Sequence, residues 1–312
     1  MKITTLASLV LVVFFSAVLA PARQSPNRHL LRGNEFAAQK EWDQAIAEYR
    51  LAVRANPDDE TAHYDLANAL AAQGELKGAI VEYRTSIRLD AGNAAAHNNL
   101  GLALAKSGRA ADAAAEYRSA IHLKPEFAAA YYNLGNALDA TGDLDGAIAE
   151  YRAALRFDPD DPQALNNLGN ALKAKGEPGD AIQAYRRALR IRPQYAAAHF
   201  NLGNVLADQG KLGAAIAEYR VTLLLDPDDD AAQQNLAYAF VKEGDLTRAV
   251  FEYRWTVRRH PNDALARYNL ANTLEKQGRL KAALEQYRMA TTLASTNSKY
   301  RADYQRLSQD LK

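Results

Sequence analysis

Asparagine recurs along this chain at intervals that place carboxamide side chains in two long rows. Members of the first row are 34 residues apart, at Asn99, Asn133, Asn167, Asn201, Asn235 and Asn269. A second row keeps the same period, at Asn34, Asn68, Asn136, Asn170, Asn204 and Asn272. A carboxamide both donates and accepts hydrogen bonds, so it can pair with a peptide backbone whatever the peptide's side chains are. Each bond contributes about 0.5–1.5 kcal/mol net, so useful affinity needs several in register.

Beside the first row lies a position that is aromatic in every second period. Its aromatic members are Tyr64, Tyr132, Phe200 and Tyr268, and they alternate with Asn98, Asn166 and Gln234. Aromatic side chains are enriched among the residues that dominate binding interfaces. This row is therefore a second set of candidate contacts for a partner.

No motif in the chain supports catalysis or a metal site. GxSxG, HExxH, P-loop and GxGxxG motifs are absent, and the chain has no cysteine to act as nucleophile or thiolate ligand. His63, His97 and His199 share one register but lie in separate periods. Packed helices lie about 8–10 Å apart, whereas a metal needs ligands at about 2 Å. The sequence therefore predicts no enzyme activity, no cofactor and no metal.

The elements that position these rows follow from a 34-residue repeat. The dipeptide Tyr-Arg recurs at this period, with its tyrosines at Tyr49, Tyr83, Tyr117, Tyr151, Tyr185, Tyr219, Tyr253 and Tyr287. Glycine lies nine residues before the tyrosine in all periods but the first, which has Lys40, and proline lies eight residues after it in six periods. The glycine predicts a left-handed turn that closes one helix, and the proline ends the next. Lys40 should cost about 1 kcal/mol if the turn is kept.

This pattern resembles the tetratricopeptide repeat (TPR). The likeness includes alanine four residues before each tyrosine, a small residue three after it, and the pairs Leu100-Gly101, Leu134-Gly135, Leu168-Gly169 and Leu202-Gly203. It implies an all-α fold, an α-solenoid in which helix–turn–helix repeats stack into a right-handed superhelix. We expect eight repeats over residues 26–297, at 26–59, 60–93, 94–127, 128–161, 162–195, 196–229, 230–263 and 264–297. Residues 298–312 are expected to form an amphipathic capping helix, with a partner-binding helix as the alternative.

The resemblance implies that the first helices of the repeats line a concave groove, which would hold both asparagine rows and the aromatic row. The arrangement resembles the asparagine ladder in the TPR superhelices of O-linked N-acetylglucosamine transferases. Asparagine and aromatic residues are also common at these positions of TPR repeats for structural reasons, so both roles stay open. The aromatic row contains no basic residue, and we therefore expect no clamp for a C-terminal carboxylate.

The first residues differ from the repeats. Met1-Lys2 precedes an uncharged run from Ile3 to Ala20, which ends in the sequence Ala20-Pro21-Ala22. A basic start, an apolar run and an A-x-A ending predict a secretory signal peptide over residues 1–22. An uncleaved membrane anchor is the alternative, although the run is slightly shorter than the roughly 20 residues that span a bilayer. The protein is thus expected to be exported, periplasmic or secreted, or anchored to the membrane by this segment.

The charge of the chain is balanced, with 38 basic against 37 acidic residues, and cleavage that removes Lys2 would make them equal. No global field then attracts nucleic acid or a membrane surface. The arginine after each tyrosine is expected on the outer helices. Glutamate precedes the tyrosine in six of the eight periods, and it is expected to neutralise that arginine.

These features together predict a scaffold that binds a protein or peptide in its groove, in the assembly of a cell-envelope complex. One alternative is a non-catalytic, substrate-selecting subunit of an enzyme such as a glycosyltransferase. Another is a membrane-tethered assembly factor. The expected partner is a protein or peptide and not nucleic acid, with membrane contact only if the N-terminal segment is kept.

Overall fold

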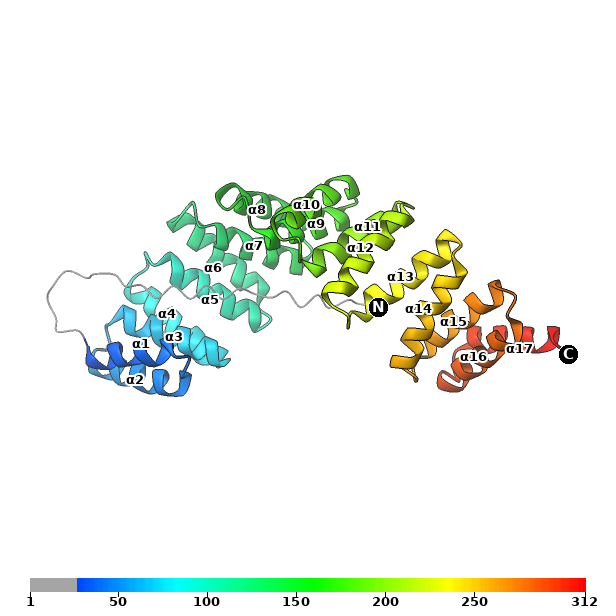
Figure 1. The fold of residues 1–312 in the computed structure, drawn as a ribbon. Helices are drawn as coiled ribbons and strands as arrows, with labels where there is room; N and C mark the ends of the chain where they lie inside the picture. Colours follow the sequence, from blue (N-terminus) through cyan, green and yellow to red (C-terminus); the bar gives the residue numbers. More distant parts are fainter. Residues whose placement is uncertain (1–26) are drawn as a thin grey trace. The chain divides into compact units, whose positions relative to one another are not determined.

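The computed structural model describes residues 27–312, and this part of the chain forms seventeen helices and no strands (Figure 1). The prediction for residues 1–22 lies outside the described residues. The helices are α1 (Arg28–Ala38), α2 (Trp42–Ala55), α3 (Glu60–Gln73), α4 (Leu76–Leu89), α5 (Ala94–Lys106), α6 (Ala110–Leu123), α7 (Ala128–Thr141), α8 (Leu144–Phe157), α9 (Pro162–Lys175), α10 (Pro178–Ile191), α11 (Ala196–Asp208), α12 (Leu212–Leu225), α13 (Asp230–Glu243), α14 (Leu246–Arg259), α15 (Ala264–Lys276), α16 (Leu280–Leu293) and α17 (Ser298–Asp310). The expected all-α solenoid is confirmed.

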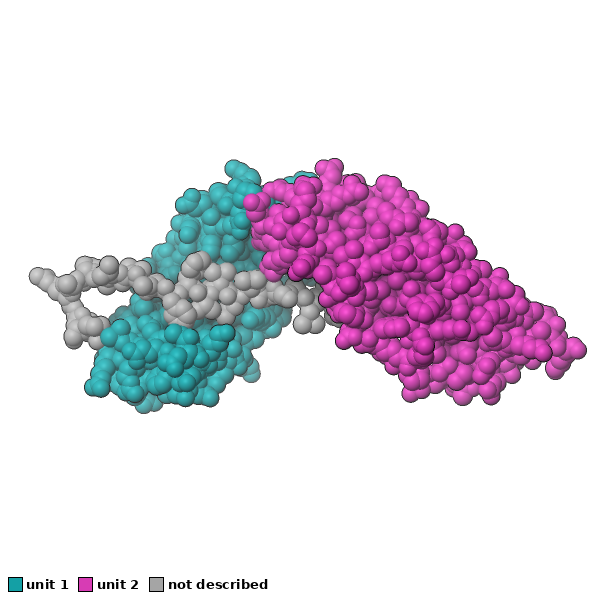
Figure 2. Space-filling view, in the orientation of Figure 1, with its two compact units in different colours: residues 1–159 teal, residues 160–312 magenta. Residues whose placement is uncertain are grey.

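Contacts within the chain divide it into two compact units, residues 1–159 and residues 160–312 (Figure 2). The described helices of the first unit are α1 to α8, and those of the second are α9 to α17. In both units the helices pack in pairs, and the first helix of one pair also packs on the first helix of the next, as α3 does on α5 and α11 does on α13. Among the described helices, the second helices of successive pairs do not pack on one another to this extent. The first helices therefore form the inner face of each unit, and the second helices form the outer face.

Helix ends follow the predicted turn residues. Asp59 and Asp161 cap α3 and α9, because their carboxylates accept backbone N–H groups of the first turn at 2.8–3.2 Å. The glycines in the turn within each pair have φ between 73° and 92°. Lys40 has φ 61° at the same place in the first pair, so the left-handed turn is kept there without glycine, as expected.

The tyrosine of each Tyr-Arg pair is the centre of the core, and none of the eight is more than 3% exposed. Its ring lies against the glycine of the Leu-Gly pair in the preceding helix. A Cβ atom built on Gly101 would lie 2.5 Å from Cε1 of Tyr117, which is far inside van der Waals contact. This close approach is the physical reason for the Leu-Gly pair.

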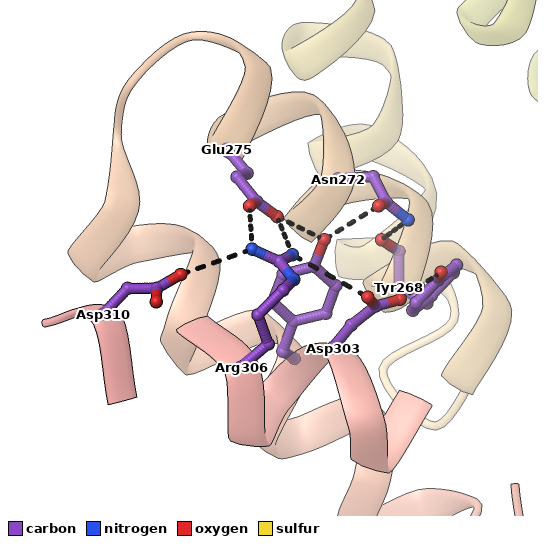
Figure 3. Close-up of polar contacts among 7 residues, drawn as sticks. Tyr268, Asn272, Glu275, Asp303, Arg306 and Asp310 are labelled. Carbon is purple, nitrogen blue, oxygen red and sulfur yellow. Dashed lines mark hydrogen bonds and ion pairs between the residues drawn. The ribbon is translucent and has the colours of Figure 1, made fainter. Parts of the chain in front are cut away.

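The C-terminal helix α17 packs on the last helix pair in the register of a further first helix. Tyr300 stacks on Tyr268 with ring centroids 4.3 Å apart, and Leu307 is buried. The guanidinium of Arg306 reaches both carboxylate oxygens of Glu275, at 2.8 and 3.0 Å (Figure 3). The last pair is therefore covered by a helix held through stacking, apolar contact and an ion pair.

Candidate functional site

In the first unit, the first asparagine row lies between neighbouring first helices. Asn99 on α5 donates from Nδ2 to Oδ1 of Asn68 and to the hydroxyl of Tyr64 on α3, each at 3.1 Å. Asn133 on α7 donates to Oδ1 of Asn98 at 3.0 Å. Asn99 and Asn133 are each only 3% exposed. These carboxamides join repeats to each other, and little of their surface is accessible to a partner.

The second unit has equivalent contacts with more accessible side chains. Asn201 donates from Nδ2 to Oδ1 of Asn166 at 3.0 Å, and Asn235 donates to Oδ1 of Asn204 at 2.8 Å. The side chains of the first row are only half-buried in this unit, at Asn167, Asn201, Asn235 and Asn269. Asn269 makes no side-chain hydrogen bond with any residue in 27–312. Its whole carboxamide is available to a partner.

The second asparagine row accepts hydrogen bonds from the core tyrosines. The hydroxyls of Tyr49, Tyr83, Tyr151, Tyr185, Tyr219 and Tyr287 donate at 2.7–2.9 Å to Oδ1 of Asn34, Asn68, Asn136, Asn170, Asn204 and Asn272, in that order. Each tyrosine follows its asparagine by 15 residues. The sequence-based predictions did not include this pairing, although the constant separation is visible in the sequence. A structural role of the row within each pair follows from these bonds.

The aromatic row packs mainly in the core. Tyr64, Tyr132 and Tyr268 are buried, and Phe200 is half-buried. Each ring meets the core tyrosine of its own pair with centroids 5.7–6.2 Å apart, in the tilted arrangement that favours aromatic contact. The rings of this row are therefore chiefly structural, and Phe200 presents the most accessible surface.

An exposed tyrosine on α13 adds to the inner face of the second unit. Tyr238 is 54% exposed, and the ammonium of Lys242 lies 5.3 Å from its ring centroid. Tyr238 was not among the predicted site residues, although it stands 34 residues after Asn204, where the second row would have asparagine. We use the term unit-2 inner surface for Asn201, Gln234, Asn235, Tyr238 and Asn269. It combines carboxamides with an accessible aromatic ring.

An acidic group occupies the first asparagine row in the second repeat. Asp65 stands 34 residues before Asn99 and is only 6% exposed. Burial, with added repulsion from Glu60 and Asp59, raises the pKa of its carboxyl to about 7. A protonated Asp65 resembles the neutral asparagines of the row, so the buried position selects a neutral side chain.

The expected neutralisation of the outer arginines by the glutamate before each tyrosine is wrong in at least four repeats. Glu48, Glu82, Glu116 and Glu218 instead accept hydrogen bonds from Nδ1 of His29, His63, His97 and His199, at 2.6–2.7 Å. Residues two apart on a helix point about 200° apart, so the glutamate faces the first helix while the arginine faces away from it. Among the described residues, the arginines of this row form one ion pair with an acidic residue, between Arg50 and Glu75 at 4.0 Å.

The described residues 27–312 contain neither a cation site nor a bilayer-spanning helix. No group of three or more histidine, aspartate or glutamate side chains in this range is arranged to hold a metal ion. None of the helices in the same range is both long enough and apolar enough to cross a membrane.

Comparisons with known proteins agree with this architecture. Family models described as "TPR repeat" match residues 33–74, 67–108, 103–142, 135–176 and 169–210. Models described as "Tetratricopeptide repeat" match residues 196–229 and 235–298. Together they cover most of the chain that the structure describes.

Individual proteins match over shorter stretches or at lower identity. The Hsp70-Hsp90 organising protein of Plasmodium falciparum (isolate 3D7) is 43% identical over 47 residues, which are 15% of this chain and 8% of that protein. The crystal structure of MamA is similar with a TM-score of 0.50 and 26% identity, over 54% of this chain and 92% of MamA. YrrB, described as a TPR protein with an unusual peptide-binding site, has a TM-score of 0.52 and 22% identity, over 59% of this chain and 95% of its own.

The 34-residue helix pairs, the core tyrosines packed on glycine and the family matches along the array agree with one another. The chain belongs to the tetratricopeptide repeat family.

Proposed function

We propose that this protein is a non-catalytic scaffold that binds a protein or peptide on the inner face of its first helices. The observation that carries the proposal is the unit-2 inner surface, where Asn269 and Gln234 keep side-chain hydrogen-bonding groups that no described residue uses. Asn201 and Asn235 are held in place through Nδ2, which leaves their Oδ1 atoms as acceptors.

The chemistry of this surface suits an extended segment of a partner. Carboxamides can bond the N–H and C=O groups of a peptide backbone, and Tyr238 supplies an aromatic anchor of the kind enriched in binding hot spots. The helices that carry these groups are packed before the partner arrives, so less conformational entropy is lost on binding. The printed description of YrrB as peptide-binding, and the name of the Hsp70-Hsp90 organising protein, support a partner of the same class.

The proposed cellular role is assembly of a cell-envelope complex by an exported protein, periplasmic or secreted. This part rests on the sequence of residues 1–22, whose basic start, apolar run and Ala-Pro-Ala ending suit a signal peptide. A tethered assembly factor retains these residues, so the intact mass of the protein from its native source distinguishes the two forms. A substrate-selecting subunit would instead co-purify with an enzyme.

The binding proposal is tested by affinity capture from the native source with the triple variant Gln234→Ala, Tyr238→Ala and Asn269→Ala. These changes remove accessible groups and none of the hydrogen bonds that join repeats. We expect the partner captured by the unmodified chain to be lost. A matched control is Val81→Ala, which truncates an exposed side chain on the outer helix α4. Retention of the partner by the triple variant would show that this surface is not the binding site.

A further inference from the structure

The outer face of the second helices carries two rows of arginine on one side of each helix. One row directly follows the core tyrosine, and the other lies four residues later, as in Arg186 and Arg190 on α10 or Arg254 and Arg258 on α14. Residues four apart lie on the same helix face, so like charges stand side by side there. Because the glutamates before the tyrosines turn toward the first helices, they do not compensate these charges.

Helix α14 combines this charge with accessible apolar side chains. It contains four arginines and a single acidic residue, Glu252, which accepts a hydrogen bond from Gln233 of α13 at 2.7 Å. Within residues 27–312 the guanidinium groups of Arg254 and Arg258 form no ion pair and no hydrogen bond. Phe251, on the same helix, is 61% exposed.

Two further side chains extend this patch. Leu224 near the end of α12, the preceding second helix, is 80% exposed. Trp255 on α14 is half-buried, and the guanidinium of Arg259 lies 5.1 Å from its ring. We use the term α14 outer patch for Leu224, Phe251, Arg254, Trp255 and Arg258. It is both cationic and apolar on a face that no other described helix covers.

We propose that the α14 outer patch binds the surface of a membrane that contains anionic phospholipids. The planar guanidinium groups match phosphate oxygens in a bidentate geometry, and arginine near an anionic bilayer gains electrostatic attraction. Phe251 and Leu224 are placed to enter the boundary between head groups and acyl chains, and tryptophan favours the same depth. The contact is peripheral, because only a few side chains take part.

Three observations favour a lipid surface over a nucleic acid or an acidic protein. Side chains as exposed as Leu224 and Phe251 gain most from an environment that buries hydrocarbon, which a phosphate backbone does not provide. The balanced charge of the chain, 38 basic against 37 acidic residues, is not the strongly basic footprint of a nucleic-acid-binding domain. Finally, both interpretations of the apolar run Ile3 to Ala20 bring the chain to a membrane during or after synthesis.

The test is sedimentation of the full chain with vesicles of phosphatidylcholine alone or with added phosphatidylglycerol. The measured quantity is the excess partitioning onto anionic vesicles, because any uptake through the apolar N-terminal run occurs on both kinds. We expect the excess to fall about 30-fold in the double variant Arg254→Gln, Arg258→Gln. Phe251→Gln should also lower it, since the apolar contact is lost.

The matched control is Arg186→Gln, Arg190→Gln on α10, which removes the same charge from the same register. Gln183 occupies there the place that Phe251 has on α14, so no apolar group accompanies the arginines. The control should keep the excess. An equal loss in both double variants, or no effect of Phe251→Gln, would indicate general attraction to polyanions and overturn the proposal. Absence of any excess in the unmodified chain would overturn it as well. Circular dichroism melting checks that each variant folds.

A second measurement uses the two tryptophans of the chain. Replacing Trp42 by Phe leaves Trp255 as the single tryptophan. Its emission should shift to shorter wavelength with anionic vesicles and stay unchanged with neutral ones. An unchanged emission on bound vesicles would show that another part of the chain makes the contact.

Discussion

The hydroxyl of Tyr83 donates to Oδ1 of Asn68 at 2.7 Å inside the second repeat. The same oxygen accepts a hydrogen bond from Nδ2 of Asn99 on the next first helix, at 3.1 Å. One carboxamide thus joins the two helices of its own repeat and also the following repeat. Because solenoid stability is a sum of repeat and interface terms, a residue that serves both should weigh heavily.

Removing this carboxamide should destabilise the array. In Asn68→Ala the hydroxyl of Tyr83 loses its partner and Asn99 loses one of its two, and both groups are buried. Leaving buried polar groups unsatisfied costs about 1–3 kcal/mol each, so we expect a loss of roughly 2–4 kcal/mol in urea unfolding. Asn269→Ala is the control and should change stability by less than about 0.5 kcal/mol. Equal effects would contradict a linking role for Asn68.

A methyl group at Gly101 should also destabilise the protein. The Cβ atom of Gly101→Ala would lie 2.5 Å from the ring of Tyr117, which is fully packed and cannot move aside freely. Overpacking of this kind costs about 1–3 kcal/mol, measured as a lower thermal midpoint. Gly179→Ala serves for comparison, because nothing lies within 4 Å of its Cβ and alanine favours the helix. That variant should be neutral or more stable.

Asp65 should make stability depend on pH. Burial, with Glu60 and Asp59, raises the pKa of its carboxyl from 3.8 in the unfolded chain to about 7. The folded state therefore keeps this proton to a higher pH than the unfolded state does. The resulting contribution to the free energy of unfolding falls as pH rises through this interval and is level above about 7.

Asp65→Asn tests this dependence, because asparagine is the residue of the row and stays neutral. The variant should lose the Asp65 contribution to the slope and gain up to about 4 kcal/mol at pH 8, from chemical denaturation at several pH values. Asp58→Asn removes a charge from an exposed side chain and should leave the slope in place. A slope that persists in Asp65→Asn would assign the pH dependence to other groups.

The ion pair between Arg306 and Glu275 should stabilise the C-terminal helix. Hydrogen bonds from Arg306 lower the pKa of the Glu275 carboxyl, although partial burial opposes this. A depressed pKa means that the contribution is present above the unfolded value of 4.5 and is lost as pH falls through the folded value. Arg306→Met should therefore weaken protection of α15–α17 in hydrogen exchange at pH 7, and less so in acid.

The size of this effect is limited by solvent, because the Arg306 side chain is 48% exposed. We expect about 1 kcal/mol at pH 7, at the upper end for a partly exposed pair. Lys276→Met, on an exposed side chain of α15 with no ion pair among the described residues, is the comparison. Equal loss of protection in both variants would contradict a specific role for Arg306.

The repeat architecture was determined by the sequence alone. Glycine and proline at a 34-residue period define where helices end, since their backbone preferences act locally and do not depend on distant neighbours. Even Lys40, which departs from the pattern, follows the turn of its register with φ 61°. The spacing of Tyr, Ala and Gly similarly determined the faces that pack, because helix geometry converts spacing into direction.

Only the tertiary structure decided what the polar side chains do. The sequence places Asn99 and Asn269 at equivalent positions, yet Asn99 is bonded to Asn68 and Tyr64 while Asn269 keeps its carboxamide unpaired within residues 27–312. The partner of Glu82 is likewise His63 across the helix pair and not the arginine two residues away. Burial and hydrogen bonding are set by residues that differ from one neighbouring helix to the next. A periodic pattern in one chain therefore indicates where a side chain stands, and the packed neighbours decide whether a partner can reach it.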